Sequence, residues 1–185
     1  MPLNTIEAIA QRYSCRAFSD RLPSEQNLNS IARAGIASPS AMNRQHWQVV
    51  VVRDPALVAD LEAEGMKNLA AQPDQSMYER ILSRGGKLYY NAPCMMLIAT
   101  PKGEGGSLDC GIVTQSIALA ATSLGIDNLI CGLAGFSFAG ERRDEFVARL
   151  GFPEGYALGI AVLLGYATAP GGKPHEPDLN KISWV

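Results

Sequence analysis

Two arginines and a serine alternate near the beginning of the chain. Arg12, Ser14 and Arg16 lie in the segment RYSCR. In an extended chain, residues two apart point to the same side, so two guanidinium groups and a hydroxyl group would converge there. Arginine binds phosphate through charge-assisted and often bidentate hydrogen bonds. The segment therefore predicts a phosphate site, although Arg12 could merely complement a helix C-terminus while Arg16 is solvated.

A loop rich in hydrogen-bonding side chains follows later in the chain. Residues 38–45, SPSAMNRQ, contain two serine hydroxyls and two side-chain amides, and they precede an apolar, β-branched segment. Such a mixture of donors and acceptors suits the polar edges of a planar heterocycle. Loops are commonly polar, however, so a turn without a ligand is the alternative interpretation.

Other catalytic arrangements have weaker support. Residues 135–139, GFSFA, are similar to the G-x-S-x-G pattern of serine hydrolases but lack its last glycine. Neither His46 nor His175 has an evident partnership with Ser137, and two histidines offer few ligands for zinc, so we expect no metal. The four cysteines form no C-x-x-C pair, and we expect them to be buried free thiols.

The composition favours one domain that associates with a further subunit. A chain of 185 residues fits a single domain. Because 47% of the residues are hydrophobic and only 18% are charged, we expect more apolar surface than one monomer can bury. The net charge of -2 argues against nucleic acid as a partner. No apolar stretch approaches the ~20 residues of a transmembrane helix, and no secretory signal is recognisable, so we expect a cytoplasmic protein.

Helices and strands interleave along the chain. An Asn4–Glu7 capping box begins a helix that ends near Arg12, and Ser24 begins a second helix that Pro39 must end. The helix at 108–124 carries no charge after its second residue, so most of its circumference must be shielded from water. Further helices are expected after the Asp54-Pro55 pair and at 141–150, and buried strands at 47–52, 94–99, 129–133 and 156–166.

The connections favour an α+β fold over a doubly wound sheet. The second strand follows a long irregular stretch, and no glycine fingerprint marks the first strand-to-helix turn. Residues 65–90 indicate an excursion from the core, because glycine, glutamine and proline interrupt their helical spacing. Residues 167–185 form a tail that ends in Leu179, Ile182 and Trp184, which indicates an arm docked on something.

In combination, these segments resemble the FMN-dependent nitroreductases. The matching elements are RYSCRAF, SPSAMNRQHW before VVVV, NAP before the second strand, DCGIVTQSIALAATSLGIDNLICGL and LLGYA. The resemblance covers most of the chain. It implies a mixed, mainly antiparallel sheet flanked by helices, in an obligate homodimer with a C-terminal arm. It also implies two identical FMN sites at the subunit interface, each contacted by both chains.

The resemblance assigns FMN contacts to residues along the whole chain. From one subunit it implies Arg12, Tyr13, Ser14, Arg16, Cys131, Gly132 and Leu133, the last three through their backbone, and from the partner Pro39, Ser40, Ala41, Asn43 and Gln45. In the tail, the family usually offers K-x-R to the phosphate, and the matching residues here are Lys173 and His175. An imidazole is only partly charged at neutral pH, so the phosphate would be neutralised less completely. His46 also departs from the family, because similar proteins often have proline before the tryptophan; it is either a solvated loop residue or lies near the substrate.

The implied activity is hydride transfer from NAD(P)H through bound FMN to a small oxidised acceptor, such as a nitroaromatic compound or a quinone, by a ping-pong mechanism. The cofactor carries this chemistry, so no catalytic side chain is expected. Positive charge from Arg16 or Arg12 would stabilise the reduced flavin, and residues 65–90 would cover the active site. A non-catalytic flavin-binding or storage homodimer, and a specialised flavin-dependent reductase or dehydrogenase of the same fold, remain alternatives.

Overall fold

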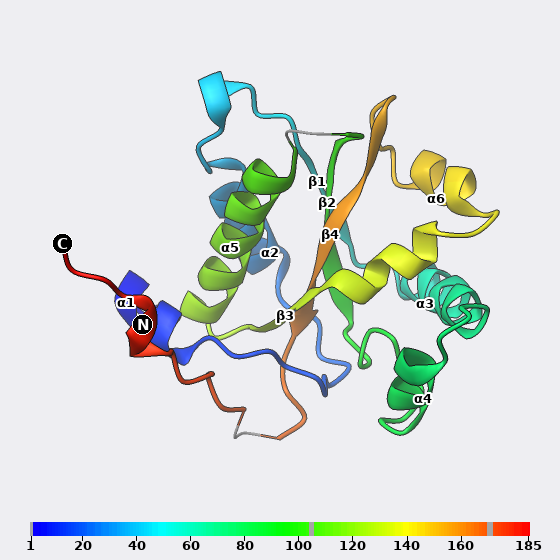
Figure 1. Cartoon of the computed structure of the whole chain (residues 1–185), viewed down its shortest axis with the longest axis horizontal. Coiled ribbons are helices and arrows are strands. Elements are labelled where there is room, and N and C mark those ends of the chain that lie inside the picture. The colour runs from blue at the N-terminus through cyan, green and yellow to red at the C-terminus, as the bar shows by residue number, and fades with distance from the viewer. Residues whose placement is uncertain (1, 104–105, 170–171) are drawn as a thin grey trace.

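Four strands form one sheet at the centre of the molecule, with helices on both faces of the sheet (Figure 1). The computed structural model describes residues 2–103, 106–169 and 172–185. A parallel bridge between Ser14 and Asn128 extends the antiparallel sheet beyond β3, so the α+β fold with a mixed, mainly antiparallel sheet is confirmed. The strand order is β1-β2-β4-β3, with β1 (Gln48–Val52), β2 (Cys94–Pro101), β3 (Asp127–Cys131) and β4 (Tyr156–Gly165).

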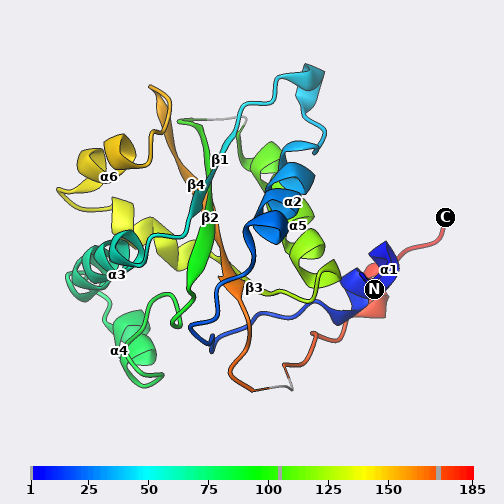
Figure 2. The same ribbon diagram turned by 180° about the vertical axis from the view of Figure 1, so that it is seen from behind.

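The helices divide between the two faces of the sheet, as both views show (Figure 2). Helices α2 and α5 cover one face, whereas α3, α6 and the 3₁₀ helix η2 cover the other. Their bounds are α1 (Thr5–Gln11), α2 (Glu25–Ile36), η1 (Ala41–Asn43), α3 (Pro55–Ala70), α4 (Ser76–Leu82), α5 (Gly106–Ser123), η2 (Gly132–Phe138), α6 (Arg143–Arg149) and η3 (Leu179–Lys181).

Strand β2 separates two hydrophobic cores. Met95 and Leu97 pack into the core under α3 and η2, whereas Cys94, Met96 and Ile98 pack into the core under α2 and α5. Successive side chains of a strand point to opposite faces, so a strand between two helical layers needs apolar residues at every position. This explains the uninterrupted apolar run that predicts the strand.

The helix starts follow local chemistry that is visible in the sequence. Asn4 and Glu7 form the predicted capping box on α1, with both hydrogen bonds present. Ser24 caps α2 by accepting a hydrogen bond from the backbone of Asn27, and Asp54 caps α3 directly before a proline. These three predictions are confirmed.

Residues 65–90 pack on the core more closely than their interrupted spacing indicates. Helix α3 continues to Ala70, and α4 follows after a short turn. Leu69, Ile81, Leu88 and Tyr89 are almost fully buried in the core on that face. The breaks divide the stretch into short helices without removing their apolar positions from the interior. Whether this stretch also covers an active site stays a prediction.

Helices α3 and α6 are joined by an ion-pair network. Asp60 on α3 accepts a bidentate pair of hydrogen bonds from Arg142, with N···O distances of 2.6 and 3.0 Å, and also contacts Arg149. Arg142 additionally binds Glu145 at 2.7 Å. The hydrogen bonds from Arg142, and then those from Arg149, lower the pKa of Asp60 to about 2.

We predict that Asp60→Asn lowers the melting temperature at neutral pH. Because the folded pKa lies below the unfolded value of about 4, the carboxylate stabilises the fold above pH 4 and loses this effect as the pH falls toward its folded pKa. Thermal unfolding from neutral to acidic pH should therefore give variant and wild-type curves that converge in acid. Asp20→Asn, at an exposed carboxylate with no ion pair among the described residues, is the control. A difference in melting temperature between variant and wild type that stayed the same at every pH would contradict the prediction.

Candidate functional site

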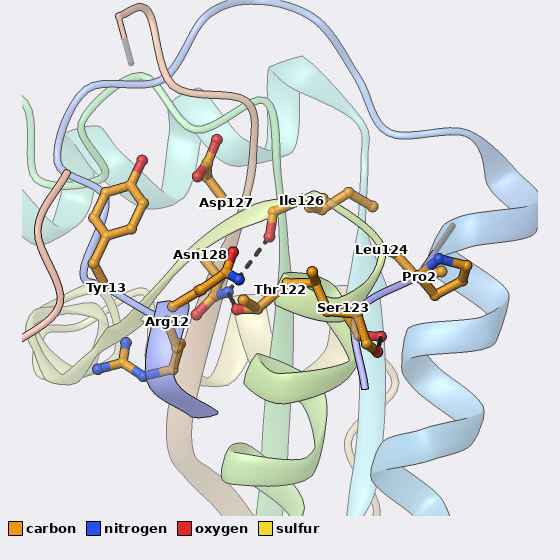
Figure 3. Close-up of a pocket in the computed structure, with 12 residues that line it drawn as sticks. Pro2, Arg12, Tyr13, Thr122, Ser123, Leu124, Ile126, Asp127 and Asn128 are labelled. Carbon is orange, nitrogen blue, oxygen red and sulfur yellow. Dashed lines mark hydrogen bonds between the residues drawn. The ribbon is translucent and has the colours of Figure 1, made fainter. Parts of the chain in front are cut away.

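A cavity of about 590 Å³ lies where α1, the C-terminal end of α5 and the beginning of β3 meet (Figure 3). Arg12 and Tyr13 line it from the segment after α1, and Asp127 and Asn128 line it from β3. Figure 3 shows the four side chains around the same space, with the last turn of α5 beside them. The cavity therefore includes part of the predicted phosphate segment.

The segment RYSCR is extended and lies along the edge of β3. The backbone N–H of Cys15 donates to the carbonyl of Asn128 at 3.0 Å, and Ser14 forms the parallel bridge to the same residue. Cys15 is 2% exposed, whereas Arg16 is exposed and Ser14 is half-buried. The alternation that the sequence predicts is thus present: the thiol points inward, and the residues on either side of it point outward.

Two polar residues at the beginning of β3 were not predicted. Asn128 is 1% exposed and donates through Nδ2 to the carbonyl of Ala118 at 3.1 Å and to Thr122 Oγ1 at 3.0 Å, but its Oδ1 has no hydrogen-bond partner within the described parts of the chain. Burial and the neighbouring Asp127 raise the pKa of Tyr13. The only signal in the sequence is a polar pair directly before an apolar strand.

The C-terminal tail runs across this segment. Gly172 passes so close to the ring of Tyr13 that a Cβ at this position would overlap the ring atoms. Lys173 and His175 follow directly and are exposed. The fold therefore brings the basic residues of the tail to the same part of the molecule as the arginines of the RYSCR segment.

The backbone at the end of β3 is open on one side. Gly132 is exposed, and no atom lies within 4 Å of where its Cβ would stand. Cys131 is 3% exposed and Leu133 is half-buried. Burial raises the pKa of the Cys131 thiol. Because Ser14 bridges to Asn128 in the parallel direction, Arg16 lies farther along β3, toward this end of the strand. A ligand at this point would meet backbone at Gly132.

From Pro39 onward the polar loop before β1 is largely exposed and its backbone is strained, whereas Ser38 is buried and its hydroxyl donates to Ser116 Oγ of α5 at 2.9 Å. Met42, Asn43 and Gln45 have φ values of 52°, 52° and 50°, in the left-handed region that residues other than glycine rarely adopt. Ser40 Oγ accepts a hydrogen bond from the Gln45 backbone at 2.9 Å, and Gln45 Nε2 donates to Asn43 Oδ1 at 3.0 Å. Strain of this kind is concentrated at functional sites. His46 follows the strained residues and is exposed.

The loop and the RYSCR segment lie at opposite ends of α5. The end of this helix borders the cavity beside Arg12, whereas η1 projects beyond its beginning, as both ribbon views show. An α-helix of 18 residues is about 27 Å long. The chain thus brings the segment after α1, the end of β3 and the basic tail to one part of the molecule, with Arg12, Tyr13, Ser14, Arg16, Cys131, Gly132, Leu133, Lys173 and His175. The residues Pro39, Ser40, Ala41, Asn43 and Gln45 belong to the segment around η1, near the other end of α5.

Apolar side chains are exposed between these two groups. Leu108, Ile112 and Leu119 of α5 line a shallow groove of about 430 Å³, and Leu108 is 73% exposed. Ile6 and Ile9 of α1 are 73% and 51% exposed. Exposed apolar residues grouped on two helices in this way are typical of a protein–protein interface. It matches the excess of hydrophobic residues in the composition.

Comparisons with known proteins agree on one family. The sequence profile described as the nitroreductase family matches residues 9–166. The chain is 51% identical to a nitroreductase from Desulfitobacterium hafniense whose crystal structure contains bound FMN; the two cover 100% of each other with a TM-score of 0.95. A nitroreductase with bound FMN from Bacteroides fragilis is 26% identical, with 99% of each chain covered and a TM-score of 0.89. An Archaeoglobus fulgidus protein, provisionally named NADH dehydrogenase/NAD(P)H nitroreductase, is 29% identical over 167 residues, 87% of this chain and 84% of that protein.

The alternative chemistries find little support. Ser137 is fully buried and contacts the hydroxyl of Tyr89, so it is not accessible as a nucleophile. No group of three or more metal-binding side chains occurs within residues 2–103, 106–169 and 172–185.

Over the same ranges, none of the helices combines the length and the apolar character that crossing a lipid bilayer requires.

All four cysteines are free thiols in the interior. Cys15, Cys94, Cys110 and Cys131 are each at most 6% exposed, and burial raises the pKa of every one of them, in Cys94 to about 12. The expectation of buried free thiols is confirmed. Because the thiolate is the reactive form, these thiols are protected both by burial and by protonation.

We predict that the native protein reacts slowly with a thiol reagent at neutral pH, and that four thiols react once guanidinium unfolds the chain. The measurement is the absorbance of the released chromophore with time, with free cysteine as the reference rate. A thiol in the native protein that reacted as fast as free cysteine would contradict the buried arrangement.

Proposed function

The chain belongs to the nitroreductase family, and on that premise we propose that it is an FMN-dependent oxidoreductase that uses NAD(P)H to reduce a small oxidised acceptor. One observation carries the proposal: the RYSCR segment, the end of β3 and the basic tail occupy one part of the surface. The bound FMN of the relative that is 51% identical supports the choice of cofactor.

The residues of this surface suit the parts of FMN. Arg12 and Lys173 would supply positive charge for the phosphate, with His175 as a further hydrogen-bond donor. Asn128 is among the residues that line the cavity, and its buried Oδ1 has no hydrogen-bond partner in the described structure. A turn of the side chain toward the cavity would offer this oxygen as an acceptor to the hydroxyls of the ribityl chain. When bound, FMN supplies the hydride-transfer chemistry itself.

The side chains hold the cofactor and adjust its environment. Tyr13, Ser14 and Arg16 contact the ribityl chain and the pyrimidine edge, and the cation of Arg16 favours the reduced state by its charge. Gly132 approaches the ring system with its backbone, which the open space beside its Cα allows. NAD(P)H and the acceptor, a nitroaromatic compound or a quinone, bind in turn on the exposed side of the site, which constitutes a ping-pong mechanism.

We further propose that the active molecule is a homodimer in which the polar loop comes from the partner. The loop and the RYSCR segment of one chain are separated by the length of α5, so one mononucleotide does not reach both. The exposed apolar surface of α1 and α5 supplies an interface. The hydrogen bonds within the strained loop hold its amides in place before the cofactor binds. The unpaired thiols suit a reducing compartment such as the cytoplasm.

We predict that the purified protein is yellow and binds FMN, and that NADH or NADPH bleaches the flavin absorbance in the absence of oxygen. A nitroaromatic compound or a quinone should then restore the colour. A storage dimer would bind FMN without bleaching, so the same titration separates the two functions. A protein that stayed colourless after addition of FMN would contradict the proposal as a whole.

A mixing experiment tests the shared site. Arg12→Ala/Arg16→Ala removes the arginine contacts to the cofactor and Asn43→Ala/Gln45→Ala the loop contacts, so each homodimer should bind FMN at least about tenfold more weakly. A heterodimer of the two variants contains one site with both groups intact, provided that the groups come from different chains. It should bind one FMN with wild-type affinity, measured by quenching of flavin fluorescence. Arg33→Ala, at an exposed arginine of α2, is the control. A heterodimer with no tight site would place both groups in one chain and refute the shared arrangement.

A further inference from the structure

The helix that follows β3 depends on contacts from outside itself. Helix η2 is a 3₁₀ helix of seven residues that begins at Gly132. Helices of this type rarely exceed three or four residues, because their hydrogen-bond geometry is poor. A longer one needs side chains from other elements to hold it. Since its first residue is the one whose backbone faces the proposed flavin site, these contacts also determine where that backbone lies.

The C-terminal half of η2 is anchored to α3. The carbonyl of Phe136 accepts a hydrogen bond from Asn68 Nδ2 at 2.9 Å. A Cβ on Gly65 would stand 2.6 Å from Ser137 Oγ, so this glycine allows α3 to approach η2 closely. The ring of Phe138 stacks on Phe152 with the ring centroids 5.9 Å apart.

The central contact is between two buried hydroxyl groups. Ser137 and Tyr89 are 0% and 1% exposed, and the hydroxyl of each has only the other as its hydrogen-bond partner within the described residues. Tyr89 also belongs to the same hydrophobic core as Cys131, which immediately precedes η2. A single tyrosine therefore contacts the C-terminal part of this helix and shares a core with the residue before its beginning.

The backbone after Tyr89 reaches the other side of the site. Tyr90 and Asn91 have φ values of 54° and 61°, a costly conformation for two consecutive residues other than glycine. The carbonyl of Tyr90 accepts a hydrogen bond from the backbone of Phe18 at 3.1 Å, two residues after the RYSCR segment. Tyr89 and the strained residues that follow it thus connect η2 with the chain that carries the arginines.

We propose that Tyr89 is a positioning residue that, through Ser137, fixes η2 and the Gly132 backbone relative to the bound flavin. This inference rests on the proposed function. Neither hydroxyl touches the cofactor, so their effect is exerted through the helix. Loss of the contact allows η2 to shift, and the hydrogen-bonding environment of the flavin changes with it.

A set of three variants separates positioning from mere stability: Tyr89→Phe, Ser137→Ala and the double variant. Each single variant leaves one buried hydroxyl without a partner and should lower the melting temperature, whereas the double variant removes both polar groups and should regain most of the loss. The hydrogen bond between Tyr89 and Ser137 is absent from all three variants. We therefore expect FMN binding weakened about three- to tenfold and a shifted flavin midpoint potential in all three, including the double variant.

The controls make each outcome decisive. Tyr156→Phe, at a half-buried tyrosine of β4 away from the site, should change neither the potential nor the affinity. Ser137→Cys keeps the side-chain shape with a weaker hydrogen bond, and it should give an intermediate shift if the alanine variants fold poorly. A double variant with wild-type affinity and potential would overturn the positioning role. Failure of the wild-type protein to bind FMN would overturn the proposed function instead, and this inference with it.

Discussion

The hydrogen bond from the Cys15 backbone to the carbonyl of Asn128 is the contact from which the candidate site is built. It fixes the RYSCR segment along the edge of β3, and the burial of Cys15 then determines which side chains point outward. Because the segment runs parallel to β3, Arg16 lies near the end of the strand and Arg12 near its beginning. The pairing with the sheet edge therefore fixes where each arginine lies along β3.

The second determinant is the uncharged surface of α5. This helix packs against the sheet with one side and leaves apolar residues such as Leu108 exposed on another. It also separates the polar loop from the arginines by its whole length. The same helix thus leaves apolar surface uncovered and keeps apart the two polar segments of the chain.

The sequence predicts those parts of the fold that depend on neighbouring residues. The caps at Asn4, Ser24 and Asp54 are local hydrogen bonds, and the apolar run of β2 is the direct result of burial on both faces. Helix η2 was not predicted, because its stability comes from residues far along the chain such as Asn68. For the same reason the polar residues of the cavity were missed: the burial of Asn128 depends on Thr122 and on the segment after α1.

The packing of Gly172 on Tyr13 joins two segments that are far apart in the sequence. During synthesis the N-terminal part of the chain emerges first, and its local helices form before the distant contacts. The basic tail follows all four strands in the sequence, so it emerges from the ribosome after them. The nascent chain therefore contains every strand of its sheet before it acquires its complete cluster of positive charges.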